Sequence, residues 1–198
     1  MNLSRRQLLG AGALISAGLL ADRAAASVGL GAQPNVQARA MAALQTHAAH
    51  IPHRDVVGIV DFSQPSRVPR FHLVDMASGR TSTMLVAHGS GSDPANSGWL
   101  ERFSNLPGSN ASCSGSFVTA ETYNGKHGRS RKLIGLDPMN SMAESRAIVI
   151  HQAGYVSDEM AREHGRVGRS QGCFAVSARD IDEVLTRLGP GRLLYAAK

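Results

Sequence analysis

Short apolar runs separated by turn-forming residues recur along most of the chain and predict a protein built largely from β-strands. In the run at residues 70–75, hydrophobic positions alternate with other residues at the period of two that is typical of a strand in a sheet. Glycine, proline, serine and asparagine are concentrated between the runs, where turns are expected. The predicted strands cover residues 56–61, 70–75, 81–87, 147–150 and 192–196.

Two segments have helical rather than strand-like spacing. Residues 36–49 are rich in alanine and repeat apolar positions every three or four residues. Residues 177–188 place apolar side chains on one helical face and end at a glycine-proline-glycine stop at 189–191. The pattern therefore predicts a mostly β fold with flanking helices, of the α+β class.

Two connections between the predicted strands stand out. Residues 92–112 are irregular in pattern and long for a compact domain, which indicates a functional loop at a cleft rim. Trp99 and Phe103 within it are either rim aromatics or residues that pack the loop on the sheet. Asn124 followed by Gly125 is a type I′ turn signal and predicts a hairpin over residues 122–128.

Residues 1–26 have the features of an export signal. Arg5 and Arg6 precede an apolar run over residues 8–21, which is short for a membrane span, and small residues follow it. The twin arginines resemble the Tat type, although the Sec route stays open, and an uncleaved anchor is the alternative. We expect three parts: an export signal at 1–26, an N-terminal helical segment at 27–55 and a catalytic domain at 56–198. The mature protein would lie in the periplasm or cell envelope without a stable membrane span.

The net charge of the chain is +6, and it falls to +4 when residues 1–26 are removed, because three arginines and one aspartate leave with them. Mild positive charge can attract an anionic cell-wall polymer, or it can be unselected surface charge. The basic residues are neither gathered on one helix nor interleaved with aromatics. We therefore expect no nucleic-acid partner.

One cysteine and one histidine are the candidate catalytic residues. His151 follows the apolar run at 147–150, and Cys173 lies in a loop rich in glycine and arginine. A cysteine nucleophile is a thiolate, which a nearby imidazole can generate. Arg166 and Arg169 would add positive potential around the thiol. Backbone amides next to Cys173 would form an oxyanion hole.

Other uses of these residue types remain open. Cys113 and Cys173 are the two cysteines of a chain that we expect to be exported, so a structural disulfide is an alternative to a catalytic thiol. A zinc site built from Cys173 and histidines 88, 127 and 151 is less favoured, because it lacks a closely spaced ligand pair. The histidines at 47, 50 and 53 are interrupted by a proline and predict surface residues. We expect neither a metal nor another cofactor.

Three separated motifs resemble one family. The sequences HQAGYVS at 151–157, GRVGRSQGC at 165–173 and GSFVTAETYNGKHG at 115–128 are similar to those of murein L,D-transpeptidase catalytic domains of the YkuD-like type, whose signature ends in Ser-x-Gly-Cys. The likeness extends over residues 61–176. It implies a YkuD-like fold, in which the early hairpin starts the catalytic sheet, with Cys173 as nucleophile and His151 as general base.

The resemblance also implies a reaction. Cys173 would attack the carbonyl that follows the L-centre of the third residue of a peptidoglycan tetrapeptide stem, expelling the terminal D-alanine and forming a thioester. An amine acceptor would then make the protein a transpeptidase, and water would make it an L,D-carboxypeptidase. The implied substrate-binding and oxyanion residues are Gly172, Ser170, Arg169, Tyr155, Tyr123 and His127.

Two further hypotheses depend on particular residues beside the proposed chemistry. Gln152, Gln171 and Phe174 differ from the usual family residues, and they motivate the alternative of a non-catalytic cell-wall-binding module. If the family motifs converge in space, a reversible bond between Cys113 and Cys173 would switch the enzyme off.

Overall fold

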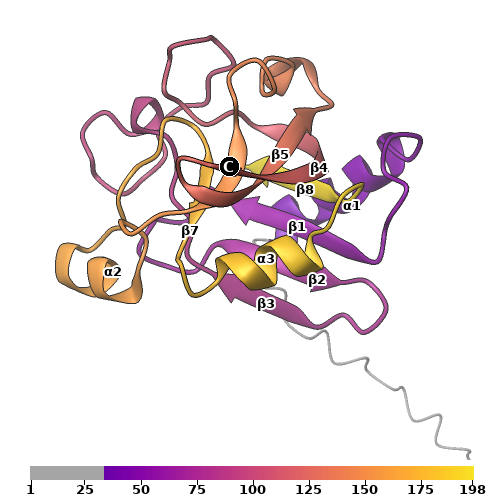
Figure 1. The fold of residues 1–198 in the computed structure, drawn as a ribbon, viewed down its shortest axis with the longest axis horizontal. Coiled ribbons are helices and arrows are strands. Elements are labelled where there is room, and N and C mark those ends of the chain that lie inside the picture. Colours follow the sequence, from indigo (N-terminus) through magenta and orange to yellow (C-terminus); the bar gives the residue numbers. More distant parts are fainter. Residues whose placement is uncertain (1–33) are drawn as a thin grey trace, which may run out of the picture.

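The computed structural model describes residues 34–198, which fold around one eight-stranded sheet (Figure 1). The export-signal prediction for 1–26 lies outside the described residues. The strands are β1 Val56–Asp61, β2 Phe71–Asp75, β3 Thr81–Met84, β4 Gly115–Gly125, β5 Gly128–Gly135, β6 Val149–Gln152, β7 Phe174–Val176 and β8 Leu193–Ala197. The helices are α1 Pro34–Thr46, α2 Asp158–His164 and α3 Ile181–Arg187, with short 3₁₀ turns at Ser90–Ser92 and Pro138–Asn140. The predicted mostly β fold with flanking helices is confirmed.

The C-terminal strand lies in the middle of the sheet. The strand order is β3-β2-β1-β8-β4-β5-β6-β7, so β8 joins the early strands to the later ones. It runs parallel to β1 and antiparallel to β4. The last strand of the chain therefore completes the core of the sheet, and the half that carries residues 149–176 depends on it for its attachment to β1.

Helices α1 and α3 pack against opposite faces of the central strands. Val57 and Ile59 of β1 pack with α1, whereas Val56 and Val60 pack with α3, as the period of two along a strand requires. Between them, Gly58 has no room for a side chain, because a Cβ there would lie 2.9 Å from the Leu188 side chain. Figure 1 shows α3 in front of the strands near β1 and β2.

The two edges of the sheet meet. After β3 the chain continues to Ala87, whose N–H donates to the carbonyl oxygen of Ala175 in β7 at 2.9 Å. Two residues later, Gly89 forms a parallel bridge with Ser170. The sheet thus curls until the segment after β3 lies against the loop that precedes β7, where the candidate nucleophile is found.

The β4–β5 hairpin is present, but its predicted tip is wrong. Asn124 and Gly125 continue β4, and Gly125 is paired with Gly128 across the hairpin. Lys126 and His127 form the tip instead, and neither has a positive φ, which a type I′ turn would require. Gly128 has a φ of 77° and supplies the left-handed residue after the tip.

Helix boundaries also differ from the pattern. The helix expected over 177–188 begins only at Ile181, because the Ser177 hydroxyl donates to the Asp180 carboxylate at 2.7 Å and this pair forms a turn before the helix. A further helix, α2, lies within residues 157–168, and the Ser157 hydroxyl caps it by accepting the N–H of Met160. Among residues 34–198, no helix is long and apolar enough to span a membrane.

Candidate active site

Strands β6 and β7 bring the two candidate catalytic side chains to one face of the sheet. His151 is the third residue of β6 and pairs in register with Ala175 of β7. Cys173 lies two residues before Ala175, so it shares a face with Ala175 and with His151. Cys173 and His151 line the same cleft, which has a volume of about 530 Å³.

Most of the predicted site residues are found at this cleft. Gly172 is the exception, since it directly precedes Cys173 in the loop but is not among the residues that line the cleft. The predicted residues that line the cleft are Cys173, His151, Tyr123, His127, Tyr155, Arg169 and Ser170.

The hydrogen bonding of His151 defines its protonation state. Its Nδ1 lies 2.7 Å from the carbonyl oxygen of Gln152. Because a carbonyl only accepts, Nδ1 carries the proton, and Nε2 of the neutral ring is an acceptor. The ring is 2% exposed and stacks on His127 with centroids 4.2 Å apart. Burial, aided by the charges of His127 and Lys126, lowers the pKa of His151, so the ring is neutral near pH 7 and able to take a proton.

The Cys173 thiol is protonated in the resting protein. Its Sγ donates to the carbonyl oxygen of Ala147 at 3.5 Å. Burial raises the pKa of the thiol above its ordinary value, and the Val149 N–H and the positive charges of Arg146 and Lys126 oppose this effect without reversing it. Cys173 therefore needs a base at the moment of reaction rather than a stored thiolate.

The cations that act on the thiol are not those expected from the sequence. Arg166 donates to the carbonyl oxygen of His164, and Arg169 donates to the carbonyl oxygen of Asp93. Arg146 and Lys126 are instead the arginine and lysine whose charges lower the pKa of Cys173. Sequence reasoning missed both, because they lie on other parts of the chain that only the folded sheet brings near the loop.

Ser170 holds the loop that carries the thiol. Its hydroxyl donates to the carbonyl oxygen of Cys173 at 2.7 Å and accepts the N–H of Gly172 at 3.1 Å. Gly172 has a φ of 113°, and a Cβ there would lie 2.7 Å from the carbonyl oxygen of Ala111. The loop is therefore closely packed, and the Gly172 N–H is engaged within it.

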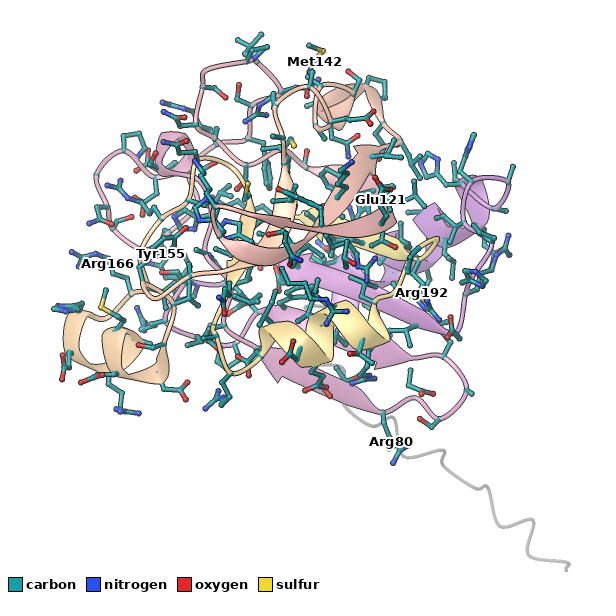
Figure 2. The ribbon with its side chains drawn as sticks, viewed as in Figure 1. Arg80, Glu121, Met142, Tyr155, Arg166 and Arg192 are labelled. Carbon is teal, nitrogen blue, oxygen red and sulfur yellow. The ribbon has the colours of Figure 1, made fainter. Side chains whose placement is uncertain are left out.

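Tyr155 forms part of the cleft near the thiol. Burial, together with the charge of the nearby Cys173 in its thiolate form, raises the pKa of its phenol to about 12, so the hydroxyl stays protonated. Gly168 leaves space for the ring, because a Cβ there would lie 2.7 Å from that of Tyr155. Figure 2 shows Tyr155 and Arg166 on the same side of the molecule.

A buried Arg70–His88–Asp93 network supports the cleft from behind. The Arg70 guanidinium lies 2.8 Å from Nδ1 of His88, and because arginine only donates, His88 Nε2 carries the proton that it donates to Asp93 at 3.2 Å. Burial, with the charge of Arg70, lowers the pKa of His88 to about 4. The carbonyl oxygen of His88 accepts the N–H of Ser170 at 2.9 Å, which links the network to the cysteine loop.

This network also bears on the zinc alternative. His88 is committed to Arg70 and Asp93 rather than turned toward Cys173. Within the part of the chain that the structure describes, no group of three or more histidine, cysteine or acidic side chains could hold a metal ion. The residues present thus offer no support for zinc. The sequence gives no signal for the Arg70–His88–Asp93 network, because its members come together only when the segment after β3 meets the loop before β7.

The two cysteines are both free thiols, which contradicts the alternative of a structural disulfide. Cys113 is fully buried in the main hydrophobic core, and burial raises the pKa of its thiol to about 11. Cys173 is partly exposed in the cleft. The more reactive of the two is therefore Cys173.

We expect alkylation of Cys173 by iodoacetamide to accelerate up to and beyond pH 9, because a raised pKa leaves the thiol protonated at neutral pH. The rate would be followed by mass spectrometry of the peptide that contains Cys173, with the buried Cys113 as an internal control in the same sample. A rate that levels off below about pH 8 would instead reveal a thiolate held by an imidazolium.

A comparison with known protein families identifies the family of this chain. Residues 30–197 match the family described as YkuD_2, L,D-transpeptidase catalytic domain. The chain therefore belongs to the L,D-transpeptidase catalytic domain family, as the sequence motifs predicted. A comparison with curated proteins gave no match.

Solved structures with a similar fold include L,D-transpeptidases. One from Mycobacterium smegmatis is 11% identical to this chain, with a TM-score of 0.43. The match covers 73% of this chain and 59% of the M. smegmatis chain. One from Mycobacterium tuberculosis H37Rv is 13% identical, with a TM-score of 0.45, and the match covers 73% of this chain and 58% of the M. tuberculosis chain. The helical cell shape determining protein Pgp2 from Campylobacter jejuni is 10% identical, with a TM-score of 0.47, and the match covers 75% of this chain and 48% of the Pgp2 chain. This chain thus spans about half to three fifths of the length of these structures.

Proposed function

We propose that this protein is a cysteine-dependent L,D-transpeptidase that acts on peptidoglycan tetrapeptide stems through a thioester on Cys173. The observation that carries the proposal is the shared cleft of Cys173 and His151, in which a neutral imidazole with a free acceptor nitrogen lies on the same face as a protonated thiol. A thiol and a neutral base form the minimum set for nucleophilic acyl transfer.

The reaction begins with proton transfer. Nε2 of His151 takes the proton of Cys173 as the sulfur attacks the carbonyl that follows the third residue of the stem. The N–H of Cys173 stabilises the oxyanion, because the N–H of Gly172 already donates to Ser170. Collapse of the tetrahedral intermediate breaks the amide bond, and His151 returns the proton to the amine of the departing D-alanine.

The second half of the reaction regenerates the thiol. An amine from another stem attacks the thioester and forms a new amide, while His151 accepts the proton of the amine and delivers it to the sulfur. Peptidoglycan lies outside the cytoplasm, so this function agrees with the export predicted from residues 1–26 and with a site of action in the periplasm or cell envelope.

The positions of three unusual residues favour an enzyme over a binding module. Phe174 packs in the core against Phe62 and Phe117, away from the cleft. Gln152 acts on His151 through its backbone carbonyl, which any residue type provides. Gln171 is the one of the three that lines the cleft with the thiol. Two of the three differences therefore leave the candidate chemistry intact.

The test is incubation of the purified protein with a disaccharide tetrapeptide, followed by mass spectrometry of the protein and of the products. We expect a covalent acyl adduct on Cys173 that has lost D-alanine, together with crosslinked dimers. Released D-alanine without any dimer would assign the L,D-carboxypeptidase reaction instead. A protein that binds the stem but never carries the adduct would be the non-catalytic module.

A further inference from the structure

The tip of the β4–β5 hairpin holds a lysine beside the candidate catalytic pair. Lys126 and His127 form this tip, and both line the cleft that contains Cys173. The hairpin tip is anchored at the site, because the His127 ring stacks on His151 with centroids 4.2 Å apart and an interplanar angle of 22°. Lys126 is therefore presented where a substrate would reach the thiol.

The side chains that line this cleft carry positive charge without any acidic partner. The described residues around it include Lys126, Arg146 and Arg169 but no aspartate or glutamate. A cleft with charges of one sign concentrates ligands of the opposite sign. The peptide that occupies it is thus expected to carry carboxylates.

The three cations differ in what they already bind. Arg146 donates to the carbonyl oxygens of Ser104 and Ala111, and these bonds tie it to the loop that precedes β4. Arg169 donates to backbone carbonyl oxygens of the 93–94 segment. The side chain of Lys126 has no hydrogen bond or ion pair with any residue in the range 34–198, so its ammonium group is available to a ligand.

We infer that Lys126 is a specificity-determining residue that binds a free carboxylate of the donor peptide next to the scissile amide. This inference rests on the proposed function. Two carboxylates of a stem peptide have this chemistry: the terminal carboxylate of the departing residue, and a side-chain carboxylate on the third residue. An ammonium group on a flexible stem binds either as a point charge, and a charge-assisted hydrogen bond adds to the attraction.

The experiment measures binding apart from turnover. The full protein with Cys173→Ala cannot form a thioester, and its dissociation constant for a tetrapeptide with free carboxylates is determined by calorimetry. Adding Lys126→Gln is expected to weaken binding about tenfold, which is the size of a charge-assisted hydrogen bond in a partly exposed site. Lys126→Arg, which keeps the charge, should restore binding to within about threefold of the lysine protein.

Two amidated peptides identify the carboxylate. One is amidated at its C-terminus and the other at the side chain of the third residue. The peptide that lacks the bound carboxylate should bind the lysine and glutamine proteins equally, whereas the other should keep the tenfold difference. Arg80→Ala removes one positive charge from the turn before β3, distant from Tyr155 in Figure 2, and should leave all affinities unchanged.

Each result has a distinct meaning. Equal affinities of the lysine and glutamine proteins for the unmodified peptide, or an equal loss with both amidated peptides, would overturn the inference. Formation of the thioester is measured separately on protein that retains Cys173. Carboxylate-dependent binding at Lys126 without any thioester would support the inference while rejecting the proposed transpeptidase function.

Discussion

Changing Cys173 to alanine is expected to lower the turnover of tetrapeptide stems by about ten-thousand-fold or more, the largest effect on activity that we predict. The thiol supplies the bond-forming atom in the proposed mechanism, and no other residue can replace it. Because Cys173 is partly exposed at the cleft and not in the core, the change should leave the fold intact. Released D-alanine, measured against time, gives the rate.

The matched control for this change is Cys113→Ala. Cys113 lies fully buried in the core and takes no part in the cleft, so this variant should keep the covalent adduct and at least a large part of the rate. It also tests the hypothesis of a reversible bond between the two cysteines, since a protein without Cys113 would resist inactivation by mild oxidation.

Equal rates of D-alanine release by the wild type and by Cys173→Ala would contradict the assignment of Cys173 as the nucleophile.

Changing Arg70 to methionine is expected to lower the free energy of unfolding by about 3–5 kcal/mol, the largest effect on stability that we predict. The guanidinium is fully buried and donates to the carbonyl oxygens of Val86 and Gln64 as well as to His88. It also lies 4.9 Å from the centre of the Phe62 ring. Methionine fills a similar volume but leaves these acceptors without their donor, and it removes the positive charge that lies near the carboxylates of Asp61 and Asp93.

Urea denaturation followed by circular dichroism measures this loss. Arg80→Met is the control, because Arg80 is exposed at the turn before β3 and should change the free energy of unfolding by less than about 0.5 kcal/mol. A stability of Arg70→Met equal to that of the control would show that the buried network contributes little to the fold. Since the network reaches Ser170 through the carbonyl oxygen of His88, the variant should also lose activity under conditions in which it remains folded.

Local patterns predicted the elements whose signals are contained in a few neighbouring residues. Strand β1 has the bounds expected for residues 56–61, and β2 differs by one residue from the expected 70–75. The alternation of buried positions along a strand depends only on backbone geometry, so it is visible in the sequence. The hairpin at 122–128 was also visible, but its tip moved to Lys126 and His127, because cross-strand pairing continues β4 through Asn124 and Gly125, the two residues that signal the turn.

The candidate catalytic pair was proposed from the sequence in part by motif and in part by position. His151 at an apolar strand and Cys173 in a glycine-rich loop are local features, and the family resemblance connected them. Their common face follows from the parallel register of β6 and β7, which pairs His151 with Ala175. Register depends on the whole sheet, so no local pattern could provide it.

By itself, the sequence determined that this protein is a mostly β member of the L,D-transpeptidase catalytic domain family, with one candidate nucleophile and one candidate base. Only the tertiary structure decided which charges act on the thiol, namely Lys126 and Arg146, and which buried network holds its loop. The physical reason is that burial and Coulomb interactions depend on distances in space. Those distances arise when β8 enters the middle of the sheet and Ala87 joins Ala175 at its edges.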